Sequence, residues 1–466
     1  MDSLANDIEK KAAIVEKLAA LYPWMKPFYP RPLRDYASRL YTAPARTTSP
    51  ECRTMALHKL LAVMKKAAIR AGLPAETAAE VCRDFNERRV LQTGPHLLLL
   101  LEPEAFYTHV FSLLGLSAHN SLSYVSYAVS TMSLVERARK GPGWLTVDGR
   151  AINVFGLSRS RMIGYSLLTG NGPYRFELAS MDDGEQGDAL LYLRNLLPEA
   201  QFERPAQAIK AANLSLWPRL FGNRFTFLQL DDEDGAELVA DHLSERSSWL
   251  RTRLVESPKM ASSILEIMDH LAAGAWAGWF TRGTDFFWAY ENGKRLPLRL
   301  VGRDLVHQDT GARVVPFEPA ELVEKLLNRS LVPNMFLAFL VLAILPGVRV
   351  LGGSHQPIYY PLMRYVVVRA IDALGVDAEL RQAMELDDLP GAWGHRVLDD
   401  STSPSELLGH GGSRKSDALI GKCGDLALMD ACGAMNSFTQ DEAWAKLATQ
   451  LDRGVVSATD PEWALA

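Results

Sequence analysis

The residues most able to do chemistry lie in two polar turns, each next to an apolar run. The first turn reads Gln92-Thr93-Gly94-Pro95-His96, inside the apolar stretch from Val90 to Leu101. The second reads Gly352-Gly353-Ser354-His355-Gln356 and follows the apolar segment that starts at Leu331. Imidazole titrates near neutral pH, so His96 and His355 are candidate general bases. The alternative for His96 is a cap or a core histidine in an ordinary strand-to-helix turn.

The candidate substrate-binding residues surround these turns and one arginine-rich segment. Glycine allows close backbone approach, glutamine can orient an amide or hydroxyl, and arginine can fork onto a carboxylate or phosphate. For the arginines at 159 and 161, which follow a predicted strand, a solvated turn is an equal alternative. The candidates are Gln92, Thr93, Gly94, Arg159, Arg161, Gly352, Gly353, Gln356, Tyr360 and Arg364.

The element predicted around the first turn is a strand, a tight turn and then a helix. Gly94 permits the turn, and Pro95 suits the first turn of a helix. Backbone N–H groups at such a helix start favour an anion or a carbonyl oxygen. Glycine-bearing turns of this kind gather at the carboxyl ends of strands in an open α/β sheet, where ligands bind.

Other motifs for catalysis are incomplete. Residues 409–416 approach the phosphate-loop pattern, but Arg414 stands where glycine is required. There is no G-x-G-x-x-G, G-x-S-x-G or H-E-x-x-H, and no two histidines are spaced for a helical metal site, so we predict no metal. The acidic run Asp231 to Asp234 after a predicted strand can hold magnesium, but a helix cap is favoured.

Composition narrows the class of protein. The 466 residues carry 50 basic and 55 acidic side chains, a net charge of −5, which argues against a dominant nucleic-acid surface. The four cysteines are dispersed, as in reduced cytosolic proteins. The polar N-terminus lacks the order of a signal peptide, and the run Met335 to Leu345 is too short for a membrane helix. We therefore expect a cytoplasmic protein that does not associate with membranes.

Hydrophobic periodicity predicts three regions. Residues 1–88 form an N-terminal helical segment, residues 89–375 an α/β core with β-hairpins, and residues 376–466 a C-terminal helical segment. Asn292-Gly293 between two β-rich arms marks the clearest hairpin, and Asp148-Gly149 marks another. The fold class expected is α/β, with hairpin insertions and helical segments at both ends; the resemblance described next implies that the core sheet is Rossmann-like.

The order of these motifs resembles the bacillithiol-biosynthesis cysteine-adding enzymes. The similarity covers roughly residues 88–370 and runs through Gln92 to Pro95, the hairpin Asn292 to Leu298, and Leu345 to Tyr360. The resemblance implies a Rossmann-like core, a pocket for a nucleotide- or sugar-like ligand, and the joining of an amino acid to an amine. Four family features differ here. The second glutamine of the family's T-G-Q-Q turn has no clear counterpart, and His96 stands nearby. Gln356 stands near the position of an acidic residue, the long coiled-coil insertion is not obvious, and the Glu-Asp-His-Asp segment after the strand Leu122 to Ser130 is absent.

Three hypotheses for function follow. The first is a small-molecule biosynthetic enzyme, a ligase or transferase that forms a C–N bond between an amino acid or similar group and an amine-bearing metabolite, with a nucleotide such as ATP as the cofactor to test. The second is a non-catalytic ligand-binding accessory protein of the same fold. The third is a nucleic-acid-associated factor that uses a basic helix formed by Lys59, Lys65, Lys66 and Arg70. The sequence is silent on oligomeric state.

Overall fold

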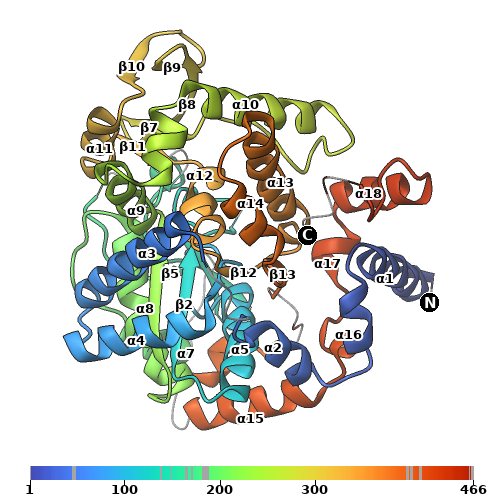
Figure 1. Cartoon of the computed structure of the whole chain (residues 1–466). Helices are drawn as coiled ribbons and strands as arrows, with labels where there is room; N and C mark the ends of the chain where they lie inside the picture. The colour runs from blue at the N-terminus through green and yellow to red at the C-terminus, as the bar shows by residue number, and fades with distance from the viewer. Residues whose placement is uncertain are drawn as a thin grey trace.

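The computed structural model describes residues 2–44, 49–136, 139–147, 149–162, 166–168, 172–180, 188–394, 398, 402–408, 412–460 and 462. It shows a mixed α/β protein built around a parallel five-stranded sheet (Figure 1). The strands of this central sheet, in spatial order, are β13 (Gly391–Trp393), β12 (Arg349–Gly352), β1 (Val90–Gln92), β2 (Ser123–Ala128) and β6 (Thr226–Asp231).

The strand order of the central sheet reverses at β1. From β1 the chain adds β2 and then β6 on one side, and later adds β12 and β13 on the other. Strands β1 and β12 pair in parallel, with Leu91 opposite Val350 and Gln92 opposite Leu351. These strands are buried along their whole length, as expected for a parallel sheet covered on both faces.

Helices cover the sheet. A helix of the β1–β2 connection contacts β2, one of the β2–β6 connection contacts β6, and one of the β12–β13 connection contacts both β12 and β13. The helices of the core are α5 (Pro103–Ala118), α6 (Arg159–Met162), α7 (Asp188–Arg194), α8 (Pro205–Phe221), α9 (Asp232–Ser244), η2 (Leu250–Val255), α10 (Pro258–Ala273), α11 (Pro319–Leu327), α12 (Met335–Phe339), η3 (Leu340–Ile344), α13 (Gln356–Leu374) and α14 (Ala378–Glu385).

Two antiparallel sheets are inserted into the core. The larger has the order β10 (Arg313–Pro316), β9 (Asp304–His307), β8 (Lys294–Val301), β7 (Phe287–Glu291) and β11 (Leu331–Pro333); the smaller comprises β3 (Trp144–Val147), β4 (Arg150–Asn153) and β5 (Ala179–Ser180). Asn292 and Gly293, both with positive φ, turn β7 into β8, which confirms the predicted hairpin.

The two ends of the chain are largely helical and lie together. In Figure 1, α1 packs beside α17 and α18. The central sheet nevertheless extends past residue 375, because β13 pairs with β12. The terminal helices are α1 (Asp2–Leu21), η1 (Pro23–Phe28), α2 (Leu33–Tyr41), α3 (Glu51–Arg70) and α4 (Ala75–Arg88), then η4 (Pro404–Leu407), α15 (Gly412–Asp425), α16 (Leu428–Ala431), α17 (Asn436–Thr439) and α18 (Glu442–Asp452).

One predicted helix start is wrong. The segment that follows β1 does not become helical at Pro95; it runs irregularly to α5, which begins at Pro103. Residues from other parts of the chain accept hydrogen bonds from its backbone. Leu97 N donates to Val129 O at 3.1 Å, and Leu100 N donates to the side chain of Asn213 at 3.0 Å. These N–H groups therefore bind distant residues and do not form the helical hydrogen bonds that the apolar run predicted.

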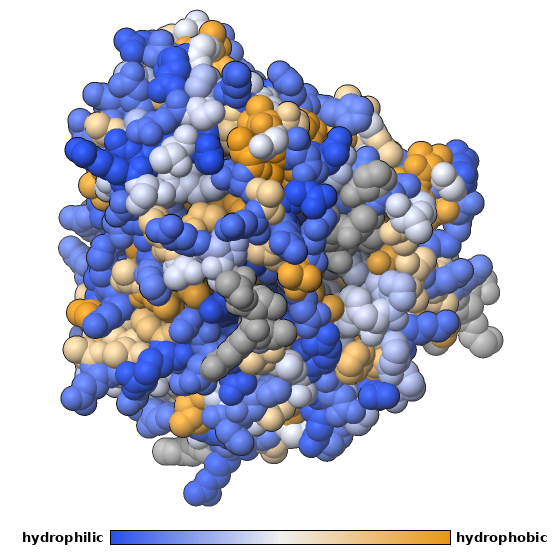
Figure 2. Space-filling model, in the orientation of Figure 1, coloured by the Kyte–Doolittle hydropathy of each residue, from blue (hydrophilic) through white to orange (hydrophobic). Residues whose placement is uncertain are grey.

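The exposed surface is mostly polar on the face shown in Figure 2, with apolar residues in small separate patches. Patches of that size are ordinary on a globular protein and mark no broad docking surface there. Along the described residues, no helix combines the length and apolarity needed to cross a bilayer.

Candidate functional site

The two polar turns predicted from the sequence meet in the structure. Strands β1 and β12 end side by side, so the residues that follow them share the carboxyl edge of the central sheet. Thr93 N donates to Leu351 O at 2.7 Å, and Thr93 Oγ1 donates to Gln356 Oε1 at 2.8 Å. The turn at Gly94 and the turn at Gly352 and Gly353 are thus linked by direct hydrogen bonds.

The polar groups at this junction are satisfied mainly by one another. Gln92 is fully buried, and its Nε2 donates to Ser112 Oγ and to Gly394 O, both at 2.9 Å. Its Oε1 accepts from Gly94 N at 3.0 Å. A Cβ on Gly352 would lie 1.9 Å from the carboxamide of Gln356, so the backbone and this side chain are packed without space between them. The junction is a closed polar core.

The structure does not bring the two candidate histidines together at this junction. His96 is exposed, and its Nδ1 lies 2.9 Å from Glu136 Oε1. His355 Nε2 lies 2.9 Å from Asp441 Oδ2, and its ring packs edge-on against Trp279, with 5.0 Å between the ring centroids. Each imidazole therefore has its own carboxylate partner.

The remaining predicted residues are dispersed. Arg159 and Arg161 lie exposed on the short helix α6, and Arg161 lines a separate cavity of about 300 Å³. Tyr360 is fully buried against Phe339. Arg364 is buried and donates to Asp387 Oδ2 at 2.8 Å, which places it in an ion-pair cluster of the core.

An open cavity of about 310 Å³ lies beside the junction, between the carboxyl edge of the central sheet and the larger antiparallel sheet. The residues after β2 and β6 form its floor, and the β7–β8 hairpin and the segment after α10 form its walls. Its lining includes Tyr127, Thr131, Asp232, Trp279, Phe280, Arg282, Trp288, Arg295, Asn334, Phe336, Tyr359 and Met363. A cavity of this size suits a small metabolite.

Arg295 is the positively charged side chain of this cavity that is available to bind an anionic ligand. Its guanidinium lies 4.3 Å from the ring centroid of Trp288, and its Nη1 donates to Thr131 O at 3.3 Å. Among the described residues, no carboxylate lies within ion-pair distance of it. Arg282, by contrast, is held by Asp285 through two hydrogen bonds of 2.6 and 2.7 Å. A guanidinium beside an indole suits a planar, anionic ligand.

A buried carboxylate and phenol lie at the floor of the cavity. Tyr127 Oη donates to Asp232 Oδ1, while Ser130 N and Thr131 N donate to Asp232 Oδ2 at 2.8 and 2.6 Å. Burial raises the pKa of Asp232, and the hydrogen bond from Tyr127 opposes that rise. The raised pKa makes Asp232 a better proton acceptor than an exposed aspartate.

Two aromatic side chains connect the cavity to the closed junction. Tyr359 Oη donates to Gln356 Oε1 at 3.2 Å, and Tyr359 also lines the cavity. Trp279 also lines the cavity, and the ring of His355 packs against the Trp279 ring. The predicted residues Thr93, Gln356 and His355 therefore support the cavity wall, although none of them lines it.

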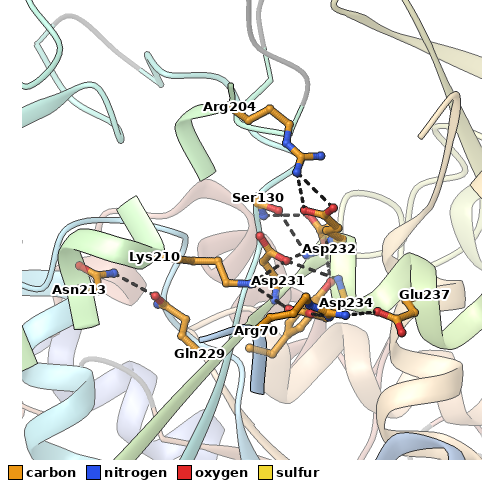
Figure 3. Close-up of polar contacts among 12 residues, drawn as sticks. Arg70, Ser130, Arg204, Lys210, Asn213, Gln229, Asp231, Asp232, Asp234 and Glu237 are labelled. Carbon is orange, nitrogen blue, oxygen red and sulfur yellow. Dashed lines mark hydrogen bonds and ion pairs between the residues drawn. The ribbon is translucent and has the colours of Figure 1, made fainter. Parts of the chain in front are cut away.

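The acidic run after β6 caps α9, as the sequence predicted (Figure 3). Asp231 and Asp234 form a reciprocal capping box at the start of the helix. Lys210 Nζ lies 3.2 Å from Asp231 Oδ1 and 2.9 Å from Asp234 Oδ2, and Arg70 Nη2 lies 2.6 Å from Asp234 Oδ1. Burial raises the pKa of Asp231 despite the nearby Lys210. These ion pairs fix the start of α9, and with it the position of Asp232, which follows Asp231 in the chain.

Arginines from two further elements hold the exposed side of the same helix start. Arg204, before α8, lies 3.1 Å from Glu233 Oε2, and Arg329, before β11, donates to Glu233 Oε1 at 2.9 Å through its Nε. Figure 3 shows Arg204 pointing toward this cluster from its own loop. Within the described ranges, no group of three or more His, Cys, Asp or Glu side chains could hold a metal ion.

Sequence reasoning missed most of the residues that line the cavity. From the sequence, Asp232 belongs to an acidic run predicted to cap a helix, with a magnesium site as the alternative, and Tyr127 belongs only to a predicted strand. Trp288 and Arg295 lie on the predicted Asn-Gly hairpin. This hairpin is one of the motifs in the resemblance to the bacillithiol enzymes, and that was the signal that could have pointed to them. For Trp279 the sequence held no signal, because its position depends on how the segment after α10 folds over α13.

Comparison with known proteins adds no relative. The sequence matches no model of a known protein family, and no curated protein matches it significantly. The similarity to the bacillithiol enzymes therefore stays a prediction that rests on the order of motifs.

Proposed function

We propose that this protein is a small-molecule biosynthetic enzyme with a Rossmann-like core, a ligase or transferase that joins an amino acid or a similar group to an amine-bearing metabolite. The observation that carries the proposal is the cavity at the carboxyl edge of the central sheet, in which Arg295, Trp288 and Asp232 meet. The reaction class itself comes from the resemblance in motif order.

The place of the cavity supports an enzymatic site. In open α/β sheets, ligands bind outside the carboxyl ends of the strands, where the strand order reverses. Here the order reverses at β1, and the cavity lies beyond the ends of β2 and β6, next to the β1–β12 junction. The junction itself is filled, so the cavity beside it is the space open to a substrate.

The chemistry of the lining supports a substrate with an anionic group and an amine. Arg295 would bind a carboxylate or a phosphate, and Trp288 would pack against a planar part of the ligand. Asp232, with its raised pKa, would accept a proton from the incoming amine. A ligase must also activate a carboxylate, and a nucleotide such as ATP is the cofactor proposed for that step.

The proposal is tested by ligand binding and product formation on the full chain. Mass spectrometry of the purified protein identifies a co-purifying ligand, and incubation with that ligand, ATP and amino acids tests for a C–N bonded product. Arg295→Ala is expected to weaken binding roughly tenfold or more, because it removes a charge-assisted contact. Arg313→Ala is the matched control, since Arg313 is an exposed arginine of the same sheet paired with Asp304. Equal binding by both variants would refute the assignment.

A non-catalytic binding protein is the second candidate, favoured by the two histidines. Neither His96 nor His355 lines the cavity, and each is paired with a carboxylate. This alternative predicts ligand binding that depends on Arg295 but no product under any substrate combination. An Asp232→Asn variant that keeps binding and loses product would exclude it.

The nucleic-acid hypothesis loses part of its support. Two of the four cations predicted to form the basic face of α3, Lys66 and Arg70, are paired with Glu237, Asp241 and Asp234 of α9. Their charges are thus offset within the protein. Binding to RNA or DNA that weakens steeply with salt would restore this hypothesis.

A further inference from the structure

A second large cavity lies at the opposite, amino edge of the central sheet. Its volume is about 670 Å³, and its lining includes the residues that enter three parallel strands: Arg89 before β1, Arg349 at the start of β12 and Pro390 before β13. The C-terminal ends of α4 and α14 complete it, through Arg88 and Asp387 among others. None of these residues belongs to the cavity proposed as the active site.

Guanidinium groups outnumber carboxylates around the amino-edge cavity. Its lining carries four arginines, against three acidic residues of which Glu87 is exposed. Each of the other two carboxylates is shared by two arginines, one of them from outside the lining. The arginines of the lining are Arg53, Arg88, Arg89 and Arg349; Asp387 pairs with Arg53 at 2.6 Å and with Arg364 at 2.8 Å, and Asp388 pairs with Arg39 at 2.9 Å and with Arg349 at 3.3 Å.

Arg89 is one of two arginines of the lining that have no carboxylate partner among the described residues; the other is Arg88, whose Nη2 donates to His119 O at 2.7 Å. Arg89 Nε donates to Asn86 O at 3.3 Å, and no carboxylate of the described chain lies within ion-pair distance. The side chain is partly buried. Burial and the nearby Arg53 lower its pKa, while the charge of Asp387 opposes the shift. An anion in the cavity would favour the charged form of Arg89.

Two details show that Arg53 is held in place. Arg53 is 5% exposed, and its Nε is buried without a hydrogen-bond partner among the described residues. Gly347 has a φ of +67°, and a Cβ there would lie 2.9 Å from Arg53 Nη1. The backbone therefore passes against the guanidinium at a distance that only glycine allows. Because such an arginine is already rigid and desolvated, little further conformational entropy is lost when it binds a ligand.

We propose that the amino-edge cavity binds a small metabolite through its phosphate group, with Arg89 as the principal contact and Arg53 and Arg349 as the surrounding charges. Planar guanidinium groups bind phosphate oxygens in a bidentate manner, and a phosphate dianion offers enough oxygens for more than one of them. The volume leaves room for a ligand larger than the phosphate itself. This site is independent of the function proposed for the carboxyl-edge cavity.

The proposal is tested by calorimetry and thermal shift on the full chain. The probes are inorganic phosphate, pyrophosphate and AMP, with sodium chloride at matched ionic strength and citrate as a carboxylate probe. Binding of at least one phosphate probe is expected, together with a rise in the melting temperature that chloride does not produce. Absence of binding by all three phosphate probes at millimolar concentration would overturn the proposal, and so would tighter binding of citrate than of every phosphate probe.

Two variants locate the site. Arg89→Gln is expected to weaken phosphate binding roughly tenfold or more, through the loss of a charge-assisted contact. It removes a cation that faces Arg53, so the melting temperature without ligand should not fall. Arg83→Gln on α4 is the matched control, because Arg83 is 67% exposed and lies outside the cavity. Undiminished binding by Arg89→Gln would overturn the assignment, whereas loss of binding in that variant alone supports it.

Discussion

Gly352 shows how a single missing side chain shapes the carboxyl edge of the sheet. The Gln356 carboxamide occupies the place where a Cβ would lie, at 1.9 Å, and from there it reaches Thr93 and Tyr359. The glycine is therefore required by close approach, since its φ is not positive. The polar junction depends on this contact.

Gly352→Ala is expected to lower the free energy of unfolding by about 1–3 kcal/mol, because the methyl group overpacks the junction and displaces Gln356. Denaturant unfolding measures the change. Gly421→Ala is the control: Gly421 lies within α15, and apart from its chain neighbours and the backbone of its own helix no described atom lies within 4 Å of its Cβ position. Alanine there should be neutral or stabilise by up to about 1 kcal/mol. Equal effects of the two substitutions would contradict the contact.

His242 makes stability depend on pH at the acid end. Its ring is 1% exposed, its Nδ1 lies 2.8 Å from Ser248 Oγ, and burial, followed by the charge of Lys59, lowers its pKa to about 3. The ordinary value in an unfolded chain is about 6.5. The unfolded state therefore takes up a proton between these values while the folded state does not, and the stabilisation present above pH 6.5 is lost as the pH falls toward 3.

We expect His242 to contribute a loss of about 1.4 kcal/mol of unfolding free energy per pH unit between about pH 6 and pH 3. Urea unfolding at several pH values measures this slope. His242→Asn removes the titrating group and should flatten the profile in that window, whatever its effect at neutral pH. His270→Asn, at an exposed position near the end of α10, should leave the profile as in the parent protein.

At the scale of elements, the start of α9 ties several helices to the end of β6. The capping box of Asp231 and Asp234 satisfies the helix N–H groups, and Lys210 from α8 and Arg70 from α3 neutralise the carboxylates. A buried pair of this kind stabilises weakly as a whole, but removal of one partner leaves a charge without compensation.

Lys210→Met is expected to lower the free energy of unfolding by about 3–5 kcal/mol, because Asp231 and Asp234 lose their shared cation in a buried place. Lys66→Met is the matched control. Lys66 pairs with Glu237 and Asp241 at the surface, where it is 50% exposed, so about 1 kcal/mol or less is expected. Thermal or denaturant unfolding distinguishes the two, and a small loss in Lys210→Met would show that Arg70 suffices.

At the scale of the whole molecule, the C-terminal helices close the junction between β1 and β12. Trp444 of α18 is fully buried, its Nε1 donates to Ser354 O at 3.0 Å, and its ring packs against Trp279 and Phe438. The segment around α17 and α18 therefore covers the second polar turn, nearly ninety residues away in sequence.

Trp444→Ala is expected to cost about 3–5 kcal/mol of unfolding free energy, and to increase hydrogen exchange in α17 and α18 before the central sheet opens. Hydrogen exchange read by mass spectrometry checks both regions. Leu327→Ala, at a position 62% exposed, should change neither measurement. Uniform exchange across the whole molecule in Trp444→Ala would mean that the C-terminal cover is not a separate unit.

Local sequence signals determined much of this protein. The hairpin at Asn292-Gly293 and the helix cap at Asp231 were both predicted and are both observed, because each depends on residues within a few positions of one another. The mixed α/β class followed from the same signals. The meeting of the turns at Gly94 and Gly353 was also expected, since parallel strands end at one edge of a sheet.

Tertiary structure alone decided the rest. The run after Pro95 is not a helix, because distant partners such as Val129 and Asn213 take its backbone N–H groups. The lining of the cavity was not predicted for a related reason. Arg295 and Asp232 line one cavity only because the β7–β8 hairpin lies against the residues after β2, where Arg295 Nη1 donates to Thr131 O. Local propensity extends over a few residues, whereas a site depends on which charges and rings packing brings together across the whole chain.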